Sequence, residues 1–137
     1  MLQLLEGQAP VSSLDSPAAG GFTVSGMTTP TINISALTFD CGDALGVATF
    51  WSQLLARPLD EGATSEFASI SATPVTLAFA AVPEPKASKN RLHLDLAVPE
   101  LREATDAAVR LGADLVETFE GWNVLRDPFG NEFCLVG

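Results

Sequence analysis

The chain has 137 residues, and its seventeen acidic and seven basic side chains give a formal net charge of -10 at pH 7. That length suits one domain with a buried core and is too short for two ordinary domains. A hydrophobic content of 47% argues against disorder, and no apolar run is long enough to span a bilayer. Because negative charge repels phosphate backbones and anionic lipids, nucleic acid and membrane are not expected partners, and a cationic ligand is favoured.

The N-terminal region differs in composition from the rest. It is rich in Gly, Pro, Ser and Thr from about Gly7 to Thr31, with no sustained apolar period, which predicts a flexible arm over residues 1–31. The start, MLQLLEGQAP, lacks the basic and long apolar segments of a secretion signal, and two cysteines do not make a disulfide framework. We therefore expect a cytoplasmic protein with one domain over residues 32–137.

From Ile34 onward the chain repeats itself. ISALTFDCGD, from Ile34, aligns without a gap with RLHLDLAVPE, from Arg91, and both alternate like half-buried strands. A helical pattern follows each; Asp43 is a plausible N-cap of the first, and Pro58 blocks its extension. TPVTLAFAAV, from Thr73, then aligns with the C-terminal DPFGNEFCLV. The later strands are predicted over residues 67–71, 75–82, 115–120, 122–126 and 132–136, in an order βαβ(β)β twice, with modules at about 32–83 and 90–137.

Two stretches, KNRLHLDL from Lys89 and DPFGNEFCLV from Asp127, resemble the vicinal oxygen chelate superfamily of glyoxalases, bleomycin-resistance proteins and dioxygenases, and within it the glyoxalase-like domains. The resemblance implies an α+β fold in which two βαβββ modules form a curved, cup-like mixed sheet, often in a homodimer. Enzymes of this superfamily hold a divalent metal in the cup with His, Gln or Glu from the first and last strands of each module.

Carried over residue by residue, the four ligand positions are Ala36, Ala80, His93 and Cys134. Only His93 is a usual ligand for this fold. The two alanines have no donor atom, and Cys134 stands where metal-using members carry a carboxylate. The resemblance therefore implies an incomplete site for a hard metal. No cofactor is assigned, and a divalent metal is kept as the alternative.

Strand parity predicts which side chains line the cup. Leu92, Leu94 and Leu96 face the helix, which leaves Arg91, His93 and Asp95 on the opposite face. If residues 127–131 form a hairpin loop, cross-strand partners on that face are Val124 with Cys134, Trp122 with Val136, and Arg126 with Glu132. The predicted ligand-binding residues are His93, Trp122, Cys134, Asp95, Arg91 and Val124, opposite the small side chains of Ala36, Ala78 and Ala80.

Each of these side chains also has a purely structural interpretation. His93 could be a hydrogen-bonded structural residue, and Asp95 could fix its tautomer only indirectly. In the metal-using proteins that this chain resembles, the positions of Cys134 and His93 converge on one ion, so the resemblance implies that the two side chains lie within a few ångströms. Cys134 is then either a thiolate paired with an imidazolium, with a lowered pKa, or a half-buried neutral thiol. Arg126 and Glu132 are explained equally by a cross-strand ion pair. Cys41 is predicted on the helix-facing side, so that no disulfide with Cys134 is expected.

The leading functional hypothesis is a dimeric glyoxalase-like domain that binds a small organic molecule in its cup without a tightly held metal. Trp122 would stack on the ligand, and His93, Asp95 and Arg91 would orient it, as in sequestration of a basic drug or metabolite. The alternative is a metal-dependent lyase, isomerase or dioxygenase in which His93 and Cys134 bind a softer ion with help from Glu132 or a neighbouring subunit. Cysteine chemistry at Cys134 is a third possibility.

Overall fold

The computed structural model describes residues 23, 24, 26–28 and 30–137. They belong to two compact units, Met1–Asn33 and Ile34–Gly137. In the first unit β1 (Thr23–Val24) pairs antiparallel with β2 (Met27–Thr28). Most of the arm predicted over residues 1–31 lies outside the described residues, so its predicted flexibility concerns a part of the chain that the structure does not describe.

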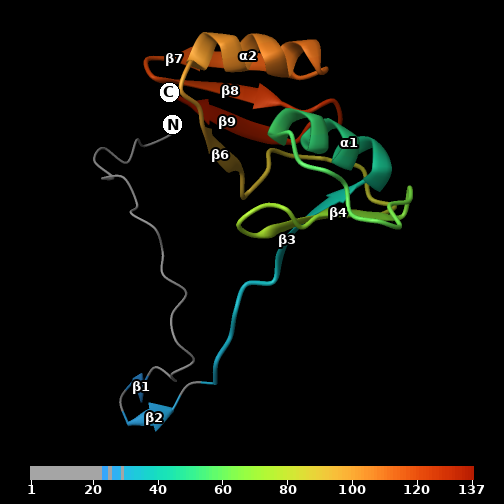
Figure 1. Cartoon of the computed structure of the whole chain (residues 1–137), viewed down its shortest axis with the longest axis vertical. Coiled ribbons are helices and arrows are strands. Elements are labelled where there is room, and N and C mark those ends of the chain that lie inside the picture. The colour runs from blue at the N-terminus through green and yellow to red at the C-terminus, as the bar shows by residue number, and fades with distance from the viewer. Residues whose placement is uncertain (1–22, 25, 29) are drawn as a thin grey trace. The chain divides into compact units, whose positions relative to one another are not determined.

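The second unit contains two mixed sheets and two helices, which confirms the predicted α+β class (Figure 1). The first sheet has the order β3-β5-β4, with β3 parallel to β5 and β4 antiparallel to it. The second has the order β6-β9-β8-β7, in which only β6 and β9 are parallel. The bounds are β3 Ala36–Cys41, α1 Ala44–Leu55, β4 Phe67–Ile70, β5 Thr76–Ala81, β6 Leu94–Ala97, α2 Leu101–Arg110, β7 Asp114–Phe119, β8 Trp122–Arg126 and β9 Glu132–Val136.

The first module has one strand fewer than the second. Between α1 and β4 the chain runs through turns and contains Pro58, which has no N–H, and Gly62, whose φ is +84°. At this edge Asp60 donates its N–H to the Ser69 carbonyl at 2.9 Å, and its carboxylate accepts the hydroxyls of Ser69 and Ser71. The hydrogen bonds of Asp60 thus occupy the sheet edge that β7 forms in the second module. The strand given in parentheses in the predicted order βαβ(β)β is absent from the first module. The sheet is also interrupted between β3 and β6, so the cup is not closed.

The ends of α1 follow from local chemistry. Asp43 is the N-cap, and its carboxylate accepts the Gly46 N–H at 3.2 Å. Ala56 ends the helix with a left-handed φ of +51°, and Pro58 follows it, as predicted. Within the described part of the chain, neither helix has the length and apolar character needed to cross a bilayer.

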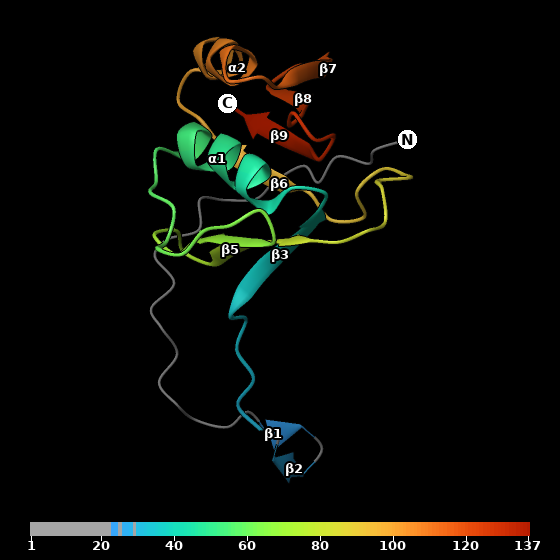
Figure 2. The ribbon, with the colours of Figure 1, turned by 90° about the vertical axis from the view of Figure 1, so that its right-hand side faces the viewer.

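A single core lies on the helix side of both sheets. Trp51 of α1 packs edge-on against Phe133 of β9, with ring centroids 5.1 Å apart, and Phe79 of β5 is fully buried. Figure 2 shows α1 between the strands of the first module and β9. Leu94 and Leu96 pack against this core as predicted, but Leu92 is 69% exposed, because β6 begins only at Leu94 and the alternation does not extend back to residue 92.

The carboxylate of Asp127 connects the two modules inside this core. Asp127 is 1% exposed and accepts four hydrogen bonds. The Trp51 indole N–H donates at 3.0 Å and the Asn131 side-chain amide at 2.8 Å to one oxygen, while the backbone N–H groups of Phe129 and Asn131 both donate at 2.9 Å to the other. One side chain therefore holds the β8–β9 loop in shape and ties it to α1.

Replacing this carboxylate should destabilise the whole domain. Asp127→Ala leaves three buried donors and the partly buried Phe129 N–H without an acceptor. Each unsatisfied buried group costs about 1–3 kcal/mol, so the loss should exceed about 3 kcal/mol even with partial compensation. Urea unfolding followed by tryptophan fluorescence measures it. Asp106→Asn, at an exposed position of α2, is the control and should stay within about 0.5 kcal/mol. Equal stabilities for the two variants would contradict the role of Asp127.

Candidate functional site

The second sheet presents a set of polar side chains on the face turned away from the helices. The ladder pairs Asp95 with Cys134 across the parallel β6–β9 junction. Across β8 and β9 it pairs Val124 with Cys134, Trp122 with Val136, and Arg126 with Glu132, which is the predicted register. Because the side chains of a strand alternate between two faces, Asp95, Cys134 and Val124 share this face.

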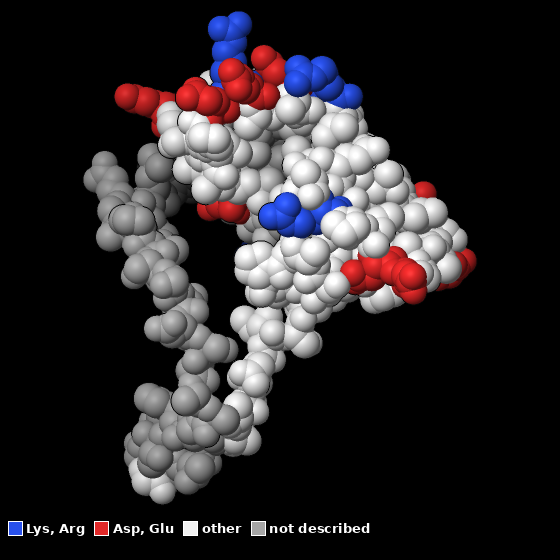
Figure 3. All heavy atoms as spheres, viewed as in Figure 1, with Lys and Arg blue, Asp and Glu red and all other residues white. Residues whose placement is uncertain are grey.

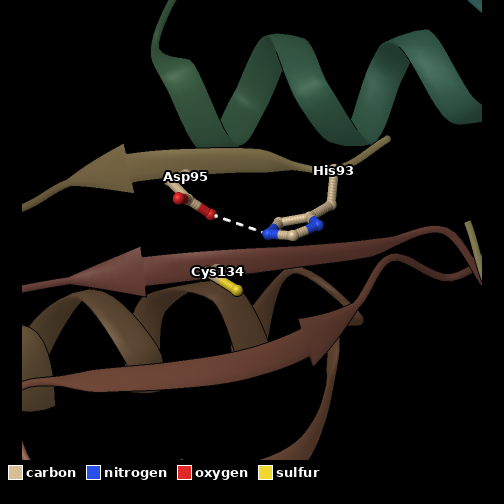
Figure 4. Close-up of side chains that lie close together, drawn as sticks. All are labelled: His93, Asp95 and Cys134. Carbon is tan, nitrogen blue, oxygen red and sulfur yellow. Dashed lines mark ion pairs between the residues drawn. The ribbon is translucent and has the colours of Figure 1, made fainter. Parts of the chain in front are cut away.

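His93, Asp95 and Cys134 form a close cluster on this face (Figure 4). Nε2 of His93 lies 3.1 Å from Oδ1 of Asp95, and one donor atom from each of the three residues lies within 4.8 Å of the others. The predicted approach of Cys134 to His93 is confirmed. The expectation that Asp95 acts on His93 only indirectly was wrong, because residues i and i+2 share a strand face and His93, just before β6, can turn its ring toward the carboxylate.

The thiol of Cys134 is the buried member of the cluster, with 5% exposure. Burial, and then the negative charge of Asp95 and a hydrogen bond to it, raise the pKa of Cys134 to about 11. This direction is opposite to the one that a thiolate–imidazolium pair requires, so the neutral thiol is the interpretation that the structure supports. Cys41 is buried elsewhere, both cysteines are free, and desolvation raises the pKa of Cys41 as well.

Trp122 and Val124 lie on the same face, farther from His93. The Trp122 ring stacks on Phe119 of β7, with ring centroids 4.0 Å apart and planes at 8°. One face of the indole is therefore occupied by the protein itself, and a ligand could stack only on the other. Val124, the register partner of Cys134, is half-buried.

Glu132 does not join the cluster. Its carboxylate accepts the backbone N–H of Asn90 at 2.9 Å and the Lys86 ammonium at 3.2 Å, and Arg126 lies 3.8 Å away, which is the predicted cross-strand pair. Burial opposes the charge of Glu132, but the hydrogen bond from Asn90 and the contact with Lys86 outweigh it and hold the pKa of Glu132 below its ordinary value. Glu132 thus anchors the connector between the modules.

A cleft of about 260 Å³ lies between β3 and the chain that enters β6. It contains two of the predicted ligand-binding residues, Arg91 and His93. Its other lining residues are Leu37, Thr38, Phe39, Asp40, Asn90, Leu92, Leu94 and Asn131. Sequence reasoning missed Thr38 and Asp40, although the parity that places Ala36 on this face also places them there. A broader hollow of about 690 Å³ lies beside the connector and shares Asp40, Asn90 and Asn131 with the cleft.

Comparison with known proteins identifies the family. The model of the glyoxalase-like domain family matches residues 36–136, so the chain belongs to that family. No curated protein sequence matches it. A glyoxalase/bleomycin resistance protein/dioxygenase family enzyme from Burkholderia phytofirmans PsJN is similar in structure, with a TM-score of 0.64 and 20% identity over 76% of this chain and 97% of that one.

Fosfomycin resistance proteins have a similar fold. FosX from Mesorhizobium loti gives a TM-score of 0.62 at 14% identity, over 78% of this chain and 92% of that one. A FosX mutant from Listeria monocytogenes, complexed with Mn(II) and 1S,2S-dihydroxypropylphosphonic acid, gives 0.62 at 13% identity, over 78% and 90%. At such identities the likeness shows the fold alone.

The donor set of this chain does not fit the four-ligand metal site that the superfamily resemblance implies. Of the four corresponding positions, Ala36 on β3 and Ala80 on β5 carry methyl groups, so the first module supplies no ligand from them. In the second module a buried thiol replaces the carboxylate. A hard ion such as Mn²⁺ or Mg²⁺, which prefers oxygen ligands, lacks its partners in this arrangement.

The neutral thiol predicts slow alkylation of Cys134. In a Cys41→Ser background, the rate of reaction with iodoacetamide should rise with pH along a curve whose apparent pKa is about 11. Because the Asp95 charge opposes the thiolate, Asp95→Asn should move that curve to lower pH. Alkylation of the urea-unfolded chain is the control for the ordinary thiol. A plateau reached below pH 8 would instead establish the thiolate–imidazolium pair.

Proposed function

We propose that this glyoxalase-like domain binds a small organic molecule in the cleft between β3 and β6, as a drug- or metabolite-binding or sequestering protein without the usual complete metal site. The observation that carries the proposal is the lining of this cleft. Apolar side chains such as Leu37 and Phe39 stand beside the polar groups of Arg91 and His93. Ligand pockets combine a mostly apolar wall with a few polar groups that fix orientation.

The size of the cleft limits the ligand. Pockets for drug-sized molecules have volumes of about 300–1,000 Å³, and this cleft has about 260 Å³. A molecule of metabolite size fits this volume within one chain. A larger ligand requires either the adjoining hollow beside the connector or a second copy of the chain, so a homodimer remains part of the proposal.

Local charge favours a ligand with a basic group. The net charge of -10 attracts cations in general. Figure 3, however, shows acidic and basic side chains interspersed over α2. The charged residues of this helix are Arg102, Glu103, Asp106 and Arg110. The acidic group that lines the cleft is Asp40, which can pair with an amine, while Arg91 can donate hydrogen bonds to a carboxylate or hydroxyl oxygen of the same ligand.

The proposal has two further parts, the role of Trp122 and the location of the protein. Trp122 does not line the cleft, so its indole takes part only with a ligand that extends from the cleft along this sheet face, through the ring face that Phe119 does not cover. The cytoplasm is the proposed location, since both cysteines are free and this compartment keeps thiols reduced.

A metal-dependent lyase, isomerase or dioxygenase is the second candidate function. The observation that favours it is the approach of His93, Asp95 and Cys134 to one another. Glu132, which the sequence offered as a helper, is engaged with Lys86 and Asn90 instead. Turnover that disappears with a chelator and returns with one added divalent ion would establish this candidate.

A screen for ligands tests the proposed cleft. The tag-free chain in the presence of EDTA is screened by thermal shift against small basic metabolites and acidic molecules of equal size. Basic compounds should stabilise it, by about 2.7 kcal/mol at a concentration of 100 times Kd. Asp40→Asn and Arg91→Gln should weaken binding of a hit by about tenfold or more, because each removes a charged hydrogen-bonding group.

Matched controls on α2 separate the cleft from the general field. Asp106→Asn and Arg102→Gln make the same charge changes at exposed positions outside the cleft and should leave Kd within about twofold. Hits that bind the Asp40 and Arg91 variants as tightly as the natural chain would reject this cleft as the binding site.

A further inference from the structure

We infer that His93, Asp95 and Cys134 form a site for a borderline divalent ion of the zinc class, contained within the second module. The inference does not rest on ligand binding in the proposed cleft, although His93 also lines that cleft. His93 and Cys134 are two of the four ligand positions carried over by resemblance. The site departs from the superfamily's metal site in its third donor, Asp95, which is not one of those positions, and in taking no donor from the first module.

The register of the sheet creates the donor triangle. Asp95 and Cys134 are directly paired on adjacent parallel strands, which lie about 4.8 Å apart. His93 precedes Asp95 by two residues and turns its ring to the same face, where Nε2 reaches Oδ1 at 3.1 Å. A nitrogen, an oxygen and a sulfur donor therefore lie on the same side of the sheet, all within 4.8 Å of one another.

These separations are close to those of a loaded site. Around tetrahedral zinc, with bonds of about 2.0–2.3 Å, ligand atoms lie about 3.3–3.8 Å apart, so the widest separation needs to shrink by roughly 1 Å. The side chains that would move have the freedom to do so, because His93 is 33% and Asp95 61% exposed. Cys134, at 5% exposure, is the fixed point of the site. The exposed side of the cluster leaves a fourth position for water or a ligand.

The donor chemistry selects the ion. Thiolate and imidazole prefer zinc, cobalt or nickel, whereas magnesium and manganese prefer oxygen donors. Cys134, on the last strand of the chain, β9, stands where metal-using members carry a carboxylate. A thiol at this position shifts the metal preference of the site from hard to borderline ions. Without an ion, the same three groups are joined by the His93–Asp95 ion pair and the contact of the thiol with Asp95.

Cobalt(II) binding tests the site directly. The tag-free full chain is stripped with EDTA, dialysed, and titrated with Co²⁺ and then with competing Zn²⁺. We expect one cobalt per chain, with a thiolate-to-cobalt charge-transfer band in the near ultraviolet that zinc abolishes. The chain has one histidine and two cysteines, so a small set of variants is enough to assign the nitrogen and sulfur ligands.

Variants assign each ligand. Cys134→Ser should lose the band, and Asp95→Asn and His93→Gln should weaken binding by more than about tenfold, while Cys41→Ser, which changes the cysteine outside the cluster, should bind as the natural chain does. Circular dichroism of each variant confirms its fold. The inference is overturned if the natural chain gives no band, if the band persists in folded Cys134→Ser, or if Asp95→Asn binds cobalt unchanged. Since the ligand screen is run in EDTA, failure of either proposal leaves the other standing.

Discussion

The buried carboxylate of Asp127 is the constraint on which the arrangement of the domain depends. A charged group can stay inside a core only if its acceptors are satisfied, and here four donors surround it. One donor belongs to α1 and the others to the β8–β9 loop. The loop is therefore held in shape by its own three donors and tied to α1 by the Trp51 indole, which connects β9 of the second module to the helix of the first.

This connection determines what the other face of the sheets can do. With the helices and aromatic rings gathered on one side, β3 and β6 are left as neighbouring edges that line a common cleft without a ladder between them. Glu132 adds a second connection, because it binds Asn90 and Lys86 of the connector and so holds the entry to β6 beside β9. Arg91 and His93 owe their place at the cleft to this anchor.

Much of this architecture could be predicted from the sequence, because alternation and an internal repeat are local signals. From these signals it was possible to predict both helices, the pairing of Val124 with Cys134 and the sheet face on which His93 lies. What failed depends on contacts that periodicity does not contain. Parity assigns a side chain to a face but not its reach, so the direct contact of Asp95 with His93 was missed. The end of a strand is set by its partner, which left Leu92 outside the core, and the loop motif indicated a turn but not that Asp127 would bind Trp51.

The two modules share a plan but differ in the polar groups that they carry. In the first, the corresponding ligand positions hold alanine, and Asp60 occupies the sheet edge in place of a strand. In the second, the polar groups are concentrated on two adjacent strands, with a carboxylate added at Asp95. A metal site with ligands from both modules requires the two modules to stay at a fixed distance. A metal site on the β6–β9 ladder requires only that these two strands keep their register. The donors of the proposed ion site lie in one module, so the cleft between β3 and β6 needs no ion ligand from the first module. Leu37 and Phe39 of β3 are therefore left to contact the proposed organic ligand.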